Sequence, residues 1–113
     1  MISFQDFLKL DIRIGKIVEV KDHEKARNPM YILKVDFGNL GIKQAVAGIK
    51  PWYQKEELLD KKFPFVVNLE PKKIAGEPSE CMILAAVKHV GDKEEDVVVL
   101  QPEKDIEIGS KVS

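Results

Sequence analysis

The sequence predicts an all-β fold, in the form of a small barrel that is closed or nearly closed. Apolar and polar residues alternate with a period of two in several short stretches, which is typical of strands with one buried face. Glycine, proline and asparagine separate these stretches as turn residues do. No stretch keeps the helical apolar period of about 3.6 residues, so a helix-rich fold is disfavoured.

A short helix is expected before the first strand. Ser3 is a candidate N-cap, and Asp6 would lie near the positive end of the helix. The helix would be at most two turns long and too short to be stable alone. We therefore expect its apolar residues, Phe4, Phe7 and Leu8, to dock on another surface.

The strands follow in order along the chain. The alternating segments are 12–20, 31–37, 42–49 and 63–69. In the first segment Ile12, Ile14, Val18 and Val20 would share one side, with a bend near Gly15. Residues 38–41 form the turn between the second and third strands, and Gly48 suits a close backbone approach.

The second half of the chain has weaker signals. We expect a short helix over 54–59, a loop over 71–78 and an apolar run over 81–87. An acidic turn over 91–96 and two extended pieces, over 97–100 and 105–112, follow. The whole chain, residues 1–113, is interpreted as one domain because its length suits a single core and no segment resembles a linker.

Composition places the chain among ordinary globular proteins. The hydrophobic content is 44% and the charged content is 33%. No apolar run approaches the roughly 20 residues of a membrane helix, and the N-terminal residues do not resemble a signal peptide. Cys81 is the only cysteine, which excludes an internal disulfide. These features predict a cytoplasmic protein that does not bind membranes.

Charge is unevenly distributed, although the net charge is only −1. Residues 1–88 contain 15 Lys/Arg and 12 Asp/Glu, whereas residues 89–113 contain 3 and 7. The acidity is thus concentrated near the C-terminal end. Because binding follows local potential, the rest of the chain can still present a basic face.

The sequence gives no positive support for catalysis. His23 and His89 are far apart and are interpreted as surface residues, so no metal site is expected. Cys81 could act as a nucleophile with His89 as its base, but a cysteine in an apolar strand is more often a small hydrophobic residue. The glycines form no phosphate-binding pattern, and we expect no cofactor.

Basic and polar groups near turns instead favour nucleic-acid binding. Asn68, Lys72 and Lys73 lie at the exit of a strand, and Ser79 and Met82 follow. These side chains suit phosphate contact and packing against an exposed base, although the two lysines could also be solvated surface charges.

Lys34 lies mid-strand on the face opposite Leu33 and Val35, so that face is expected to be wet. The wet sheet face of a small barrel can hold single-stranded or loop nucleic acid.

Four ordered motifs resemble a known family. They are Asp11–Val18, Leu33–Gly38, Asn68–Gly76 and Ser79–Met82. Together they are similar to the tRNA-binding OB-fold domain found at the C-terminus of many methionyl-tRNA synthetases and as free-standing homodimers. The same domain occurs in the bacterial protein-export chaperone CsaA. The likeness runs from about residue 4 to residue 112.

The resemblance implies a five-stranded OB-fold barrel, with N- and C-terminal extensions that form a dimer interface. The first hypothesis is a tRNA-binding homodimer, free-standing or docked on a methionyl-tRNA synthetase. The residues implied for tRNA are Lys34, Lys43, Asn68, Lys72, Lys73, Ser79 and Met82. Cys81 stands where the family's Ser-x-Gly-Met pattern has glycine.

The second hypothesis is a CsaA-like chaperone that holds unfolded preproteins in an apolar cleft at a dimer interface. Residues 38–44, 100–102 and 108–111 look like CsaA, whereas residues 79–86 look more like the synthetase-related members. Phe4, Phe7 and Leu8 are the candidate dimer contacts, with capping of their own barrel as the alternative.

Overall fold

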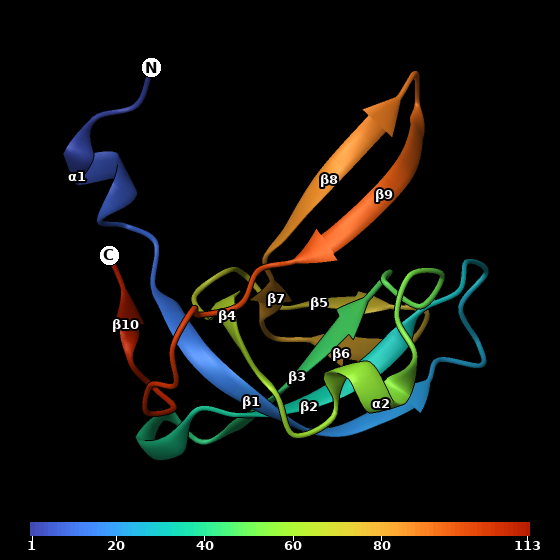
Figure 1. Cartoon of the computed structure of the whole chain (residues 1–113), viewed down its shortest axis with the longest axis horizontal. Coiled ribbons are helices and arrows are strands. Elements are labelled where there is room, and N and C mark those ends of the chain that lie inside the picture. Colours follow the sequence, from blue (N-terminus) through green and yellow to red (C-terminus); the bar gives the residue numbers. More distant parts are fainter.

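The computed structural model describes residues 1–113 (Figure 1). The helical elements are α1 (Phe4–Phe7), α2 (Lys55–Leu58) and the 3-10 turn η1 (Gly38–Leu40). The strands are β1 (Ile12–Asp22), β2 (Tyr31–Asp36), β3 (Ile42–Ala47), β4 (Lys62–Val66), β5 (Lys72–Ile74), β6 (Glu77–Ser79), β7 (Met82–Ile83), β8 (Ala85–Val90), β9 (Lys93–Val99) and β10 (Lys111–Val112). Neither helix is long and apolar enough to cross a membrane.

One antiparallel sheet forms a nearly closed barrel, as the sequence predicted. Its strand order is β3-β2-β1-β4-β7, and β10 pairs with the start of β1. The chain also forms two separate hairpins, β5–β6 and β8–β9. The β5–β6 hairpin lies beside β3, and the β8–β9 hairpin projects from the barrel (Figure 1).

The core lies inside this barrel. The second strand has the predicted alternation, because Tyr31, Leu33, Val35 and Phe37 are all buried in one cluster. The Phe37 and Phe65 rings meet edge to face with their centroids 5.5 Å apart, a favourable aromatic geometry. The face of β2 that was expected to be wet is only partly so, since Ile32 on that face is buried.

The first strand departs from the predicted alternation at a bulge. Ile12 and Ile14 are buried as expected, but the register with β2 shifts at Val18. The bulge adds one residue after Ile17, which is fully buried in the core cluster, and leaves Val18 39% exposed. Val20 then packs against the core again. The prediction that Val18 lies on the buried face was therefore wrong.

The close backbone approach lies at Gly15 and not at Gly48. A Cβ atom on Gly15 would lie 2.5 Å from side-chain atoms of both Phe37 and Val35. A Cβ on Gly48 would meet only the Met30 methyl group, at 3.6 Å. Gly15 therefore makes room for the central packing between β1 and β2.

Two hairpins replace the loop and the acidic turn expected in the second half. The segment 71–78 contains β5 and most of β6, which are joined by a turn at Ala75 and Gly76 with positive φ angles of 50° and 87°. The acidic residues 94–96 belong to β9, and Gly91 forms the turn that precedes them. Proline and charged residues interrupt the alternation of apolar and polar residues in these segments, so the sequence did not indicate strands there.

The N-terminal helix α1 projects away from the barrel (Figure 1). Ser3 caps it as predicted: Ser3 Oγ accepts from the Asp6 amide at 3.1 Å, and Asp6 Oδ2 accepts from the Ser3 amide at 3.3 Å. No residue of α1 is buried, and Phe4 is 70% exposed. The helix therefore does not cap its own barrel.

Candidate nucleic-acid interface

The β5–β6 hairpin is attached to β3 mainly by side-chain hydrogen bonds and not by a strand ladder. Gln44 lies in the middle of β3 and is buried. Its Nε2 atom donates to the Pro78 carbonyl at 2.9 Å and to Glu77 Oε1 at 3.2 Å. Because β3 is an edge strand of the main sheet, these bonds hold the hairpin beside it.

Ser79 and Glu80 complete the attachment. Ser79 Oγ accepts from the Val46 amide at 3.1 Å and donates to the Cys81 carbonyl at 3.4 Å. Glu80 Oε1 accepts from the Gln44 amide at 2.9 Å, and the Glu80 amide donates to the Gln44 carbonyl at 2.8 Å. These contacts satisfy backbone groups of an edge strand that would otherwise need water.

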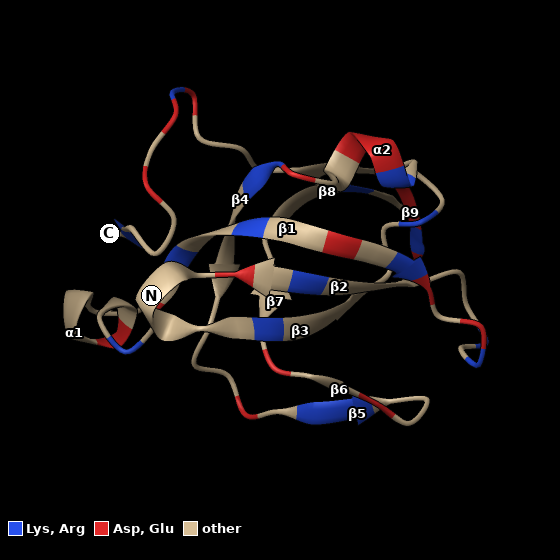
Figure 2. Ribbon diagram, turned by 90° about the horizontal axis from the view of Figure 1, so that it is seen from below, with Lys and Arg blue, Asp and Glu red and all other residues tan.

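The attachment brings Lys34 close to the hairpin that carries Lys72 and Lys73. Lys34 is the cross-strand partner of Gln44, whose amide binds the Pro78 carbonyl. Pro78 is in turn the partner of Lys73 in the hairpin. The basic ribbon segments of β2 and β5 are both visible in the view of Figure 2. Lys72 and Lys73 are exposed, and Lys34 is partly exposed.

These lysines are electrostatically available. The ion pairs of the chain involve other cations, from Lys9 to Lys88, and none involves Lys34, Lys43, Lys72 or Lys73. No internal ion pair therefore has to break before these ammonium groups contact a phosphate.

Lys43 leaves the sheet on the opposite side from Lys34. It is the cross-strand partner of Val35, whose side chain faces the core, whereas Lys34 pairs with Gln44. The side chain of Lys43 therefore lies at the edge of the barrel interior, where its charge acts on the neighbouring Cys81 thiol. The structure does not place it together with the other three lysines.

Met82 lies on the wall of an apolar groove. It is about half exposed and belongs to β7, opposite Val66 of β4. The groove has a volume of about 310 Å³ and lies between β3, β7 and the β8–β9 hairpin, with Val46 and Val87 among its lining residues. Val46 also donates its amide to Ser79, so Ser79 and Met82 flank the same edge of β3.

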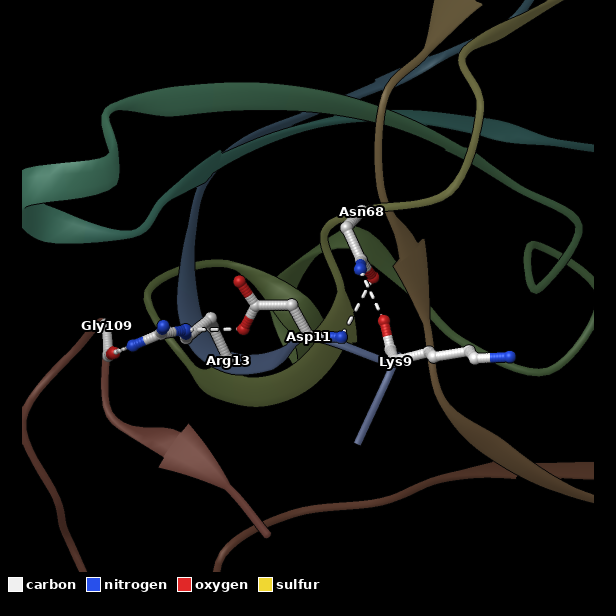
Figure 3. Close-up of polar contacts among 5 residues, drawn as sticks. All are labelled: Lys9, Asp11, Arg13, Asn68 and Gly109. Carbon is white, nitrogen blue, oxygen red and sulfur yellow. Dashed lines mark hydrogen bonds and ion pairs between the residues drawn. The ribbon is translucent and has the colours of Figure 1, made fainter. Parts of the chain in front are cut away.

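Asn68 holds the N-terminal segment (Figure 3) and is not among the residues that line the groove. Its Nδ2 atom donates to the Lys9 carbonyl at 2.7 Å, and its Oδ1 atom accepts from the Asp11 amide at 2.8 Å. The Asp11 carboxylate accepts from Arg13 Nε at 2.7 Å, and Arg13 donates to the Gly109 carbonyl at 3.2 Å. This network joins the chain segment behind α1 to the C-terminal segment.

Cys81 points into the core and not toward the surface. Its side chain belongs to the buried core cluster, and its Sγ atom lies 3.9 Å from the Gln44 carbonyl oxygen. Burial, with a smaller contribution from the Glu80 charge, raises the pKa of the Cys81 thiol to about 12, although Lys43 opposes the shift. The side chain that replaces the family's glycine therefore occupies interior space.

Sequence reasoning did not anticipate Gln44 or Glu80. Gln44 occupies a polar position of an alternating strand, and that pattern indicates only that its side chain lies on the solvent-facing side of the sheet. Its role depends on a hairpin about 34 residues away, and no local pattern reveals that contact. A buried glutamine at the edge of a sheet is recognisable once the hairpin is placed.

Comparison with protein families gives a match over residues 12–111 to the family described as "Putative tRNA binding domain". The chain belongs to this family. The resemblance inferred from the four motifs is thereby confirmed. The family is one of binding domains, which agrees with the expectation of a non-catalytic domain.

Relatives include both synthetases and a chaperone. A methionine–tRNA ligase of Pyrococcus horikoshii is 49% identical over 111 residues, which cover 98% of this chain and 14% of that protein. The chaperone CsaA from Bacillus anthracis has a TM-score of 0.90 and 42% identity, covering 100% of this chain and 99% of that chain. A MetRS related protein from Pyrococcus horikoshii has a TM-score of 0.88 and 30% identity, covering 100% of this chain and 98% of that chain.

Proposed function

We propose that this protein binds tRNA as a homodimer, through the face formed by β2, β3 and the β5–β6 hairpin. The observation that carries the proposal is the Gln44 attachment, which places Lys34 beside the hairpin that bears Lys72 and Lys73. Three lysines without ion-pair partners then lie in neighbouring elements, Lys34 on β2 and Lys72 and Lys73 on β5. Such an arrangement suits the phosphate backbone of a folded RNA.

The remaining predicted contacts differ in how they would act. Met82 offers an apolar surface on which an unstacked base can pack. Ser79 Oγ and Asn68 Oδ1 each accept one internal hydrogen bond, which leaves a lone pair for a ribose hydroxyl. Lys43 would meet RNA only if the RNA passes around the edge of β3.

We also propose that the protein works in the cytoplasm, either free-standing or docked on a methionyl-tRNA synthetase. The chain spans about 14% of the length of the synthetase relatives that it matches, so their activity is not carried over to it. An unpaired cysteine is common in the reducing cytoplasm.

The dimer would form through α1 and the C-terminal strand. Phe4 and Leu8 are exposed on a helix that contacts little of its own barrel, and β10 lies on the same part of β1 that α1 precedes. A helix this short needs a partner surface to remain ordered. In a two-fold dimer, the same apolar patch on each chain would cover its counterpart.

An electrophoretic mobility-shift series with bulk tRNA tests the proposed function. We expect binding at about 50 mM salt that weakens linearly in log–log with rising salt, because each phosphate contact releases a counterion. Duplex DNA of similar length serves as the control for charge alone. Failure to bind tRNA at about 50 mM salt would refute the proposal.

A second candidate is a CsaA-like chaperone for unfolded preproteins. Two observations favour it: the chain covers almost the whole of the CsaA structure, and Met82 lines an apolar groove. It predicts that a denatured client protein aggregates less in the presence of this protein, with little dependence on salt. No protection at a few-fold molar excess would count against this candidate.

A further inference from the structure

His23 is the one buried residue in the loop between β1 and β2. It is only 6% exposed, whereas its neighbours over 24–29 are exposed or half-buried, so the interpretation of His23 as a surface residue was wrong. Its Nε2 atom lies 2.7 Å from the carbonyl oxygen of Ile74, which ends β5 at the tip of the β5–β6 hairpin. A buried polar side chain in an otherwise exposed loop needs an explanation.

The carbonyl oxygen of Ile74 determines which nitrogen of the His23 ring carries a hydrogen. A carbonyl oxygen can only accept, so Nε2 carries the hydrogen and donates it to Ile74. This is the only hydrogen bond between residues 23–30 and the β5–β6 hairpin, and no ion pair joins the two segments. The contact spans 51 residues of sequence.

Both segments are otherwise held separately. The loop is closed at its base by the His23 amide, which donates to the Met30 carbonyl at 3.0 Å. The hairpin is held to β3 along β6, by Gln44 at Glu77 and Pro78 and by Ser79 at Val46. The His23–Ile74 bond therefore determines where the loop lies relative to the tip of the hairpin.

The loop between β1 and β2 carries two cations that form no ion pair within the protein. Lys25 and Arg27 are exposed, and neither forms an ion pair. Lys25 and Lys21 line a polar pocket together with His23 and with Glu77 of the hairpin. The hydrogen bond from His23 to Ile74 thus holds a loop that carries cations next to the hairpin that bears Lys72 and Lys73.

We propose that His23 is a positioning residue that clips the β1–β2 loop to the β5–β6 hairpin, so that Lys25 and Arg27 extend the RNA-binding face. This inference rests on the proposed tRNA binding. A loop held in advance loses less conformational freedom when its cations contact phosphates. Without the clip, the loop cations would contribute fewer defined contacts, while the hairpin would stay on β3.

The test compares His23→Leu with His23→Gln. Leucine fills the buried site but cannot donate, whereas the glutamine amide can place a donor near the position of Nε2. We expect His23→Leu to weaken tRNA binding about two- to tenfold at about 50 mM salt and to lower the salt slope by about 1, as loss of a phosphate contact does. His23→Gln should restore most of the slope.

Two comparisons separate positioning from simple destabilisation. Ile17→Val, a small truncation in the core away from the Met82 groove, should lower the melting temperature without changing the salt slope. The double substitution Lys25→Gln/Arg27→Gln should reduce tRNA binding in the wild-type background and have little additional effect in His23→Leu.

The outcomes distinguish the inference from the proposed function. If the wild-type protein binds tRNA and His23→Leu has the wild-type slope, the clip is refuted and tRNA binding stands. An equal loss from the loop substitutions in both backgrounds also refutes the clip. If the wild-type protein does not bind tRNA, the proposed function fails and the RNA role of His23 fails with it.

Discussion

At the scale of single residues, Gly15 determines how closely β1 and β2 pack. Its missing side chain leaves room for Phe37 and Val35, both fully buried. A methyl group at Gly15 would lie 2.5 Å from atoms of each, so the core would have to shift. We expect Gly15→Ala to lower the free energy of unfolding by about 1–3 kcal/mol, because overpacking a core has a cost of this size. Urea denaturation measures this change.

Gly48→Ala is the matched control for this substitution. Its new Cβ would be at an ordinary contact distance of 3.6 Å from Met30, and its φ angle is not in the left-handed region. We expect a change in stability of less than about 1 kcal/mol. Equal losses for the two alanine variants would contradict this account of the packing at Gly15.

Cys81 makes stability depend on pH in the alkaline range. The pKa of its thiol rises from an ordinary 9.0 to about 12 on folding. Between these values the unfolded chain releases a proton that the folded chain keeps, so stability falls as pH rises above about 9. Below that pH the contribution is fully present. Relative to Cys81→Ala, wild type should lose about 1 kcal/mol between about pH 8 and 10.

The measurement is urea denaturation of both proteins at each pH, so that shared lysine and tyrosine titrations cancel in the difference. In the same range, a thiol reagent should label native protein far more slowly than protein unfolded in urea, since the thiolate is the reactive form. A pH-independent difference combined with fast native labelling would show that the thiol is not buried.

At the scale of elements, alternation predicted the strands whose two faces differ. The second strand and the fourth were found from their patterns because Leu33, Val35, Phe63 and Phe65 point into one core. The bulge at Val18 was not predictable, since one extra residue inverts every later position and leaves no local mark.

The β5–β6 hairpin was missed because its stability is not local. Pro71, Gly76 and Pro78 indicate a loop when they are read alone. Its attachment comes from Gln44, Ser79 and Glu80, two of which lie outside the hairpin's own strands. Propensity is overridden here by contacts with a strand that lies more than 30 residues earlier.

The base of the β8–β9 hairpin is fastened by Tyr53. Its hydroxyl accepts from the Val99 amide at 3.0 Å, while its carbonyl accepts from the Tyr31 hydroxyl at 2.7 Å. Tyr53→Phe leaves the Val99 amide without this acceptor, and we expect about 1–3 kcal/mol of lost stability. Amide hydrogen exchange should become faster at Val99.

Tyr31→Phe is the control at this element. It removes the hydroxyl that binds the Tyr53 carbonyl but leaves the Tyr53 hydroxyl in place. Exchange at Val99 should then stay close to wild type. Unchanged protection of Val99 in Tyr53→Phe would mean that the hairpin is held without this bond.

At the scale of the whole molecule, the exposed helix α1 predicts self-association. Leu8 is 46% exposed at the end of α1, and Leu59 is 41% exposed at the end of α2. If α1 forms the dimer contact, Leu8→Asp should shift the sedimenting species from twice 12.8 kDa to 12.8 kDa. Leu59→Asp should remain dimeric. A wild-type monomer, or a dimeric Leu8→Asp, would contradict the interface.

The sequence predicted the candidate site by residue type, and its RNA role stays a prediction. The arrangement came from the structure, in which Lys34 lies on the strand next to the one that holds the β5–β6 hairpin. The separation of Lys43 follows from strand alternation once the register with Val35 is known. The internal bonds of Asn68 reach across 57 or more residues, which no motif reveals.

The salt dependence of tRNA binding is the sharpest test of whether Lys72 and Lys73 contact RNA phosphates. We would compare wild type with Lys72→Gln/Lys73→Gln and with the matched control Lys61→Gln/Lys104→Gln, whose lysines carry the same charge without ion pairs. The account predicts that the Lys72/Lys73 variant loses about 0.7–0.9 of slope for each phosphate contact and that the control keeps the wild-type slope. Equal slopes for the two variants would contradict it.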